Sequence, residues 1–138
     1  VVGFTGAVGA VTYRVTDAYA QTGSAAVSVT VNTPAAPVVA VTSPSTAWFT
    51  PIVFTPSTSG TGIVNATACI VDPGDSVCKT SVAAAGEGTF TVNTSTRAVT
   101  FSPVESFSGT TAAVTYRVSD AYGQTSAGTN NVTVAVAV

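Results

Sequence analysis

The residues best placed for chemistry are two cysteines, Cys69 and Cys78, which lie symmetrically on either side of Pro73-Gly74. If Pro73-Gly74 forms the turn of a β-hairpin, the cysteines face each other as a non-hydrogen-bonded pair, where the Cα atoms approach to about 4.5 Å. A disulfide tolerates that separation, and closing a loop of about ten residues would stabilise the fold by roughly 2–3 kcal/mol. The spacing therefore predicts a disulfide, which is typical of proteins outside the cytoplasm. Two free buried thiols are the alternative, and a turn wider than Pro-Gly is another way to build the hairpin.

Charged residues surround the same turn. Asp72 and Asp75 flank it, and Lys79, the one lysine of the chain, follows it. The two carboxylates could give oxygens to a calcium ion, which takes six to eight of them, although turn formation is the role that we favour. Lys79 could join an asparagine in an isopeptide bond, as bacterial surface domains sometimes do. That reaction needs a buried lysine beside an acid, and we expect Lys79 to face outward.

The sequence offers no catalytic residues. Histidine is absent, which excludes the Ser-His-Asp and Cys-His arrangements and makes a metal site with only two cysteines improbable. The six carboxylates are scattered, without the spacing of a paired acid and base. We therefore predict a protein that is not an enzyme and that carries no metal or other cofactor.

The charge content excludes two classes of partner. Only 7% of the residues are charged and only four are basic, whereas nucleic-acid binding needs several Lys or Arg side chains on one face to neutralise phosphates. The chain also lacks a run of about 18 apolar residues. The sequence therefore indicates neither nucleic-acid binding nor membrane insertion.

The composition favours strands over helices. Leu and Met are absent, so strong helix formers other than Ala are rare, whereas the β-branched residues Val and Thr are abundant. With 138 residues, of which 46% are hydrophobic, the chain can bury a core. We predict an all-β fold, namely an Ig-like antiparallel β-sandwich of about seven or eight short strands.

One stretch of the chain occurs twice. Residues 11–22 (VTYRVTDAYAQT) return as residues 114–125 (VTYRVSDAYGQT). A period of about one hundred residues is the size of a domain, much longer than a solenoid repeat. We therefore interpret residues 1–34 as the C-terminal hairpin of a preceding repeat, and residues 35–138 as a complete β-sandwich repeat. The segment Pro34 to Pro37 between them is typical of a short, stiff linker.

Both copies show the alternation of a strand pair with one buried face. In the first copy Val11, Tyr13 and Val15 point to one side. In the second, Val132, Val134 and Val136 point inward. Tyr13 and its counterpart Tyr116 are predicted core residues.

The turn between the paired strands carries a short motif, consisting of Asp17 and Tyr19 in the first copy and of Asp120, Tyr122 and Gly123 in the second. An Asp side chain can bond the backbone of its own turn. Gly123 adopts a positive φ at little cost, whereas the first copy has Ala20 there, so the two turns could differ. Tyr19 and Tyr122, at the tips, could pack against a neighbouring module.

The ends of the chain are candidates for strand exchange. An isolated two-stranded hairpin is marginally stable because its apolar face has nothing to pack on. Residues 1–34 therefore need a cover, either the complete module or another copy of the chain. The last residues, from Val132 to Val138, lack charge and proline, so their edge is also apt to pair. The predicted exchange segments are centred on Val11, Tyr13 and Val15, and on Val132, Val134 and Val136.

The sequence resembles the CshA-type fibril repeat of bacterial surface proteins. The resemblance rests on residues 88–93 (GTFTVN), 97–103 (RAVTFSP), 107–109 (FSG) and 114–125. The tail of each copy is also similar to the tandem cadherin-like and Ig-like repeats of large bacterial adhesins. The resemblance implies a β-sandwich module in a long fibril that holds a binding domain away from the cell wall, and it implies no catalytic motif.

We therefore predict a structural repeat of an extracellular fibril or adhesin stalk at the cell surface or cell wall, with neighbouring repeats as its partners. One alternative is an adhesive module that binds a glycan or a host protein through an aromatic or polar patch. Another is a fibre subunit that assembles by strand complementation. Three Asn-x-Ser/Thr patterns, at Asn65, Asn93 and Asn131, match glycosylation acceptors, but such patterns arise by chance in a Thr-rich chain.

Overall fold

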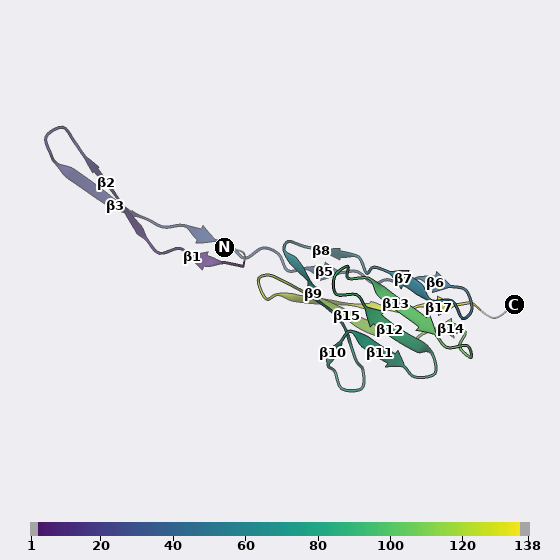
Figure 1. Cartoon of the computed structure of the whole chain (residues 1–138). Helices are drawn as coiled ribbons and strands as arrows, with labels where there is room; N and C mark the ends of the chain where they lie inside the picture. Colours follow the sequence, from purple (N-terminus) through teal and green to yellow (C-terminus); the bar gives the residue numbers. More distant parts are fainter. Residues whose placement is uncertain (1–2, 136–138) are drawn as a thin grey trace. The chain divides into compact units, whose positions relative to one another are not determined.

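The computed structural model describes residues 3–135, which form β-strands joined by turns and loops and contain no helix (Figure 1). The chain divides into two compact units, Val1–Pro34 and Ala35–Val138. These are called unit 1 and unit 2 below, and each is described by itself.

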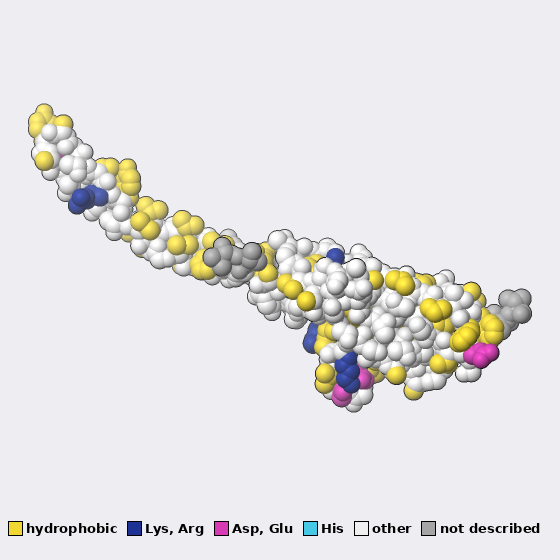
Figure 2. All heavy atoms as spheres, viewed as in Figure 1, with side chains coloured by type: hydrophobic (Ala, Val, Ile, Leu, Met, Phe, Trp, Pro, Cys, Tyr) yellow, Lys and Arg dark blue, Asp and Glu magenta, His cyan; other side chains and the backbone are white. Residues whose placement is uncertain are grey.

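Unit 1 consists of two short antiparallel strand pairs. Its strands are β1 (Gly6–Ala7), β2 (Val11–Thr16), β3 (Thr22–Val27) and β4 (Thr30–Val31). β2 pairs with β3 along its whole length, and β1 pairs with β4. All four strands are exposed to solvent, and Figure 2 shows hydrophobic side chains on the surface of this unit. Over its described residues, unit 1 therefore consists of two strand pairs that enclose no hydrophobic core.

Unit 2 is built on two four-stranded antiparallel sheets whose buried residues form one core (Figure 1). The first sheet has the order β10 (Cys78–Lys79), β9 (Ile63–Val71), β15 (Val114–Asp120) and β16 (Thr125–Asn130). The second has the order β11 (Ser81–Ala84), β12 (Gly88–Val92), β13 (Val99–Pro103) and β7 (Ile52–Phe54). The prediction of an all-β antiparallel sandwich is confirmed.

The core follows the alternation of the sequence. In β12, β13 and β15 every second residue is buried. Phe90 lies opposite Phe101 in the paired strands β12 and β13, with ring centroids 4.5 Å apart. Together with Tyr116 they are the largest fully buried side chains. Burying each such side chain is worth about 1.5–3 kcal/mol, so these residues hold the two sheets together.

Five short strands complete unit 2. β5 (Val38–Val39) pairs with β8 (Thr58–Ser59), while β17 (Thr133–Val134) lies between β14 (Gly109–Thr110) and β6 (Ser45–Thr46). The pair of β17 with β6 is parallel, which departs from the predicted antiparallel arrangement. The two strands come from opposite ends of unit 2, so no tight hairpin fixes their relative direction.

The segment that follows the disulfide turn forms two strands in two sheets. Cys78 and Lys79 pair with β9 in the first sheet, and Ser81–Ala84 pair with β12 in the second. The chain crosses from one sheet to the other at Thr80, whose carbonyl accepts a hydrogen bond from Val92 N. The disulfide hairpin is therefore short, and its second strand directly precedes the crossing to the second sheet.

Candidate functional site

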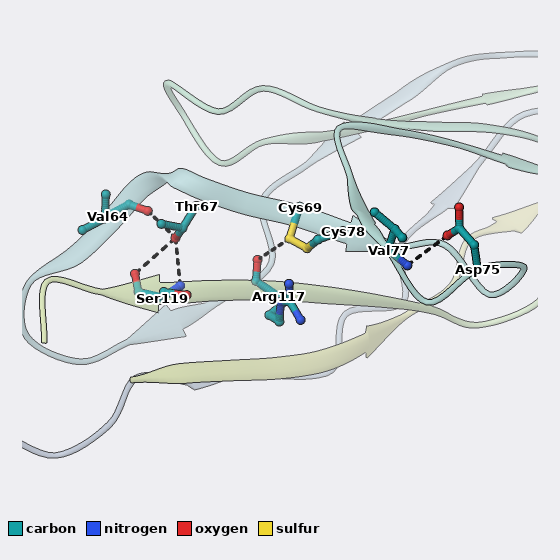
Figure 3. Close-up of a disulfide and its surroundings, with 8 residues drawn as sticks. All are labelled: Val64, Thr67, Cys69, Asp75, Val77, Cys78, Arg117 and Ser119. Carbon is teal, nitrogen blue, oxygen red and sulfur yellow. Dashed lines mark hydrogen bonds between the residues drawn. A yellow bond between two sulfur atoms is a disulfide. The ribbon is translucent and has the colours of Figure 1, made fainter. Parts of the chain in front are cut away.

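The predicted disulfide between Cys69 and Cys78 is present, with the Cα atoms 5.5 Å apart (Figure 3). The register of its hairpin differs from the prediction, because Cys78 lies opposite Val71 and not opposite Cys69. The cysteines are thus diagonal neighbours on the paired strands. Cys69 Sγ lies 3.7 Å from the carbonyl oxygen of Arg117, a contact rather than a hydrogen bond because a disulfide sulfur carries no proton. The bridge ties β10 to β9, the neighbour of β15.

The loop that shifts this register is wider than Pro-Gly. Asp72 N donates to Val77 O and Ser76 N donates to Asp72 O. The carboxylate of Asp72 accepts from Gly74 N at 2.8 Å, and that of Asp75 accepts from Val77 N at 2.9 Å. Turn formation, the role favoured from the sequence, is thus what both carboxylates do here.

The same carboxylates hold Lys79. Lys79 Nζ lies 2.6 Å from an oxygen of Asp72 and 2.6 Å from one of Asp75. The hydrogen bonds from Lys79 lower the pKa of both aspartates and raise the pKa of the lysine. The lysine side chain is 37% exposed and is paired with two aspartates, so it lacks the burial that an isopeptide bond requires.

β15 is an interior strand of the first sheet. β9 pairs with one edge and β16 with the other. Val114, Tyr116 and Val118 point into the core, and Tyr116 is fully buried. Its hydroxyl donates to Arg97 O at 3.4 Å, and burial raises the pKa of this phenol. The prediction that Tyr116 is a core residue is correct.

The pairing of β9 with β15 is interrupted by a bulge, which the sequence analysis did not find. Arg117 lies opposite Cys69, but Ser119 lies opposite Val64, so the intervening residues of β9 loop out. The hydroxyl of Thr67 fills the gap, because it accepts from Ser119 N at 2.8 Å and donates to Val64 O at 2.6 Å (Figure 3). The only sequence signal was the broken alternation of residues 63–67.

The two predicted turn motifs have the same structure. Asp120 Oδ1 accepts from Tyr122 N and Gln124 N, both at 2.9 Å. Asp17 Oδ1 accepts from the backbone N–H groups of the equivalent residues, at 2.8 and 2.9 Å. Ala20 has a φ of 65° and its counterpart Gly123 a φ of 80°, so the expected difference between the turns is absent. The Asx hydrogen bonds hold Ala20 in the left-handed region despite its Cβ.

The surroundings of these turns differ between the units. Tyr19 is 85% exposed, and no strand of the described residues lies along the β2 edge. In unit 2 the ring of Tyr122 lies against Gly62, at the start of β9, and Gly62 O accepts from Ala121 N at 2.9 Å. Tyr122 therefore has a contact inside unit 2, and its packing against a neighbouring module stays a prediction.

The predicted exchange segments fall into two groups. Val11, Tyr13 and Val15 are more than half exposed on β2, so the prediction that Tyr13 is buried does not hold within unit 1, where no second sheet exists to cover it. In contrast, Val132 and Val134 are buried and β17 has a strand on each side. These two valines are enclosed by their own unit. Val136 lies outside the described residues.

Other candidates are structural in this fold. Asn65 donates to Ser95 O, and Asn93 Oδ1 accepts two backbone N–H groups of its turn. In the described part of the chain, ion pairs are formed only by Lys79, so the arginines that precede Asp17 and Asp120 by three residues do not pair with them. Positions three apart on a strand point to opposite faces.

A hollow of about 350 Å³ lies beside the disulfide hairpin, lined largely by alanines together with Asp72 and Glu87. Both carboxylates are already bonded, that of Glu87 to Ala112 N at 3.0 Å. No group of three or more His, Cys, Asp or Glu residues that could hold a metal ion occurs within residues 3–135. Over the same residues, no helix has the length and apolarity to cross a membrane.

The sequence of unit 2 matches the repetitive domain of the surface adhesin CshA over residues 36–134. The chain belongs to this family of surface adhesin repeats. The match confirms the resemblance and covers nearly the whole of unit 2, including β9, β15 and the disulfide.

Comparison with other proteins adds little detail. No curated protein matches this chain in sequence. Among solved structures it is similar to the N-terminal eight Ig domains of Down Syndrome Cell Adhesion Molecule isoform 1.30.30, with a TM-score of 0.48 and 11% identity over 91% of this chain. The match covers 21% of that much longer chain.

Proposed function

We propose that this chain is a spacer in an extracellular fibril or adhesin stalk, in which consecutive sandwich modules hold a binding region away from the cell surface. The observation that carries the proposal is the repeated segment. Strands β1 to β4 and strands β14 to β17 have the same sequence pattern and the same pairing register, about one module apart. On this proposal unit 1 is the end of one repeat and unit 2 is the next.

The composition and the disulfide support a mechanical role. Only 7% of the residues are charged, and aspartate side chains fix the turns at Asp17 and Asp120 by hydrogen bonds to the backbone. The disulfide fastens the hairpin at which the chain changes sheets, and the segment between the units contains Pro34 and Pro37. Prolines restrict φ and stiffen a short linker. An extracellular location follows from the surface-adhesin family and agrees with the disulfide.

The test is the length of chains that contain several modules in tandem. Chains with one, two, three and four copies of unit 2, each joined to the next by residues 32–34, are compared by small-angle X-ray scattering. A spacer predicts that the maximum dimension grows by the same increment with every added module. Collapse of the longer chains into compact particles would contradict it. So would tight binding of a glycan or host protein by a single module.

A further inference from the structure

Unit 1 presents an apolar face whose proper cover can be identified, because the same strands occur covered in unit 2. Val11, Tyr13 and Val15 are exposed by 66, 62 and 52%. Their counterparts Val114, Tyr116 and Val118 are exposed by 5, 0 and 0%. The side chains are identical in the two sets, so the difference lies in what surrounds them.

The two segments are also identical in geometry. Gly6 lies opposite Val31 in unit 1, as Gly109 lies opposite Val134 in unit 2. Val8 N donates to Val29 O at 2.8 Å, and the equivalent bond in unit 2 measures 2.9 Å. Unit 1 thus already has the strand pairing that the enclosed copy has in unit 2.

Two backbone amides mark the edge that is open in unit 1. In unit 2, Ser119 N donates to Thr67 Oγ1 at 2.8 Å and Ala121 N donates to Gly62 O at 2.9 Å. Their counterparts are Thr16 N and Ala18 N. Asp17 N, which lies between them in the chain, donates across the hairpin to Gln21 O. Successive N–H groups of a strand point to opposite edges, so the N–H groups of Thr16 and Ala18 point to the open edge of β2.

We propose that unit 1 is a docking surface for the front part of a repeat of its own kind, a segment equivalent to residues 35–106 that supplies a strand like β9 to the open edge of β2. This inference deepens the proposed function and rests on it. The β9-type strand gives a threonine hydroxyl to Thr16 N and a glycine carbonyl to Ala18 N. Its sheet and the opposing sheet then bury Val11, Tyr13 and Val15, and its glycine receives the ring of Tyr19.

The occupant belongs to the same polypeptide, on the N-terminal side of Phe4. In unit 2 the front part leads directly into Phe107, the counterpart of Phe4, and a covalent connection gives a high effective concentration. A second copy of this chain is a poor donor, because its own β15 already occupies its β9.

The fit differs from that of unit 2 at one position. A Cβ added to Gly128 would lie 2.7 Å from Val39 Cγ1 and 2.9 Å from Val39 O, and the counterpart of Gly128 in unit 1 is Ala25. The strand of the occupant that corresponds to β5 must therefore lie farther out than in unit 2, or carry a smaller residue. Ala25→Gly restores the space that residues 35–106 require.

The experiment extends the full chain by a second copy of residues 35–106 joined to Phe4, with Ala25→Gly. Hydrogen exchange of the Thr16 and Ala18 amides is measured by NMR in the extended and the unextended chain, both with Ala25→Gly. We expect exchange at both amides to slow by at least about 100-fold on extension, because they become part of a cooperative unit. Unchanged exchange would overturn the proposal, whether or not the added segment folds.

Tyr13→Asp is the matched control. In the unextended chain this residue is exposed, so the thermal unfolding of unit 2 should not change. In the extended chain a buried charge should abolish the gained protection. Protection from exchange that survives Tyr13→Asp would overturn the assignment of this face as the docking surface. Protection that appears only as the protein concentration rises would overturn the assignment of the occupant to the same polypeptide. Neither result would alter the scattering test, which uses copies of unit 2 alone and thus tests the spacer function separately.

Discussion

The hairpin β2–β3 of unit 1 and the hairpin β15–β16 of unit 2 have nearly the same sequence, the same register and the same Asx turn, yet they have opposite environments. Tyr13 is 62% exposed, while Tyr116 is fully buried. Local sequence is therefore sufficient to specify the hairpin and its turn. What it leaves open is the burial of the apolar face, which depends on β9 and on the second sheet.

The largest difference should come from truncating the two equivalent tyrosines, Tyr13 and Tyr116. Tyr116→Ala empties the centre of the core and should destabilise unit 2 by about 3–5 kcal/mol. Tyr13→Ala removes an exposed ring and should change the stability of unit 2 by less than about 0.5 kcal/mol. Urea unfolding of the two variants measures both. Equal losses of stability in the two variants would mean that the apolar face of unit 1 is buried in this chain, and would contradict the comparison.

Removing the disulfide should give the next largest difference between the two units. Cys69→Ser with Cys78→Ser should cost unit 2 about 2–4 kcal/mol. It should leave the exchange of the β2–β3 amides unchanged, since unit 1 contains no cysteine. Thermal unfolding followed by circular dichroism, together with amide exchange, gives both quantities. A chain as stable without the bridge as with it would contradict its role as a fastening.

Exchanging the turn residues should give opposite effects of about 1 kcal/mol. Gly123→Ala places a Cβ in the left-handed region and should destabilise unit 2. Ala20→Gly relieves the same strain and should stabilise the hairpin of unit 1. The first is read from urea unfolding and the second from the population of the hairpin in NMR chemical shifts. Effects of the same sign would show that the two turns are not equivalent.

The smallest effect concerns Lys79, which is exposed and has no counterpart in unit 1. The pKa values of Asp72 and Asp75 are lowered in the folded state, so their stabilisation is present above the unfolded-state pKa and is lost as the pH falls through the lowered values. Lys79→Gln should therefore be slightly less stable than the unaltered chain near neutral pH and equally stable at strongly acidic pH. Salt should reduce the difference. A difference that persists in strong acid would contradict this assignment.

Periodicity predicted the regular parts of the structure, while irregular contacts escaped it. Alternation placed Tyr116 in the core, and the Pro-Gly spacing indicated the disulfide. The predicted register of that hairpin was wrong, because hydrogen bonds to the side chains of Asp72 and Asp75 stabilise a wider turn. A pattern of residue types does not report such bonds.

The enclosure of β15 depends on contacts between distant segments. Thr67 fills a bulge opposite Ser119, and Gly62 receives the ring of Tyr122. Neither residue stands out in the sequence, because threonine and glycine are common in this chain. The pairing of Val134 with β6 was equally hidden, since a parallel pair of short strands leaves no turn signal. The sequence thus indicated which face of each strand is apolar, but not which segment covers it.

Hydrogen exchange of the unaltered chain tests most directly the claim that covering, rather than local sequence, stabilises this hairpin. The β15 amides that bond across to β16, and the equivalent β2 amides that bond to β3, are followed in one NMR experiment. The β15 amides should exchange only through global unfolding of unit 2, and the β2 amides at least about 1,000-fold faster through local opening. Similar protection in both hairpins would contradict the account.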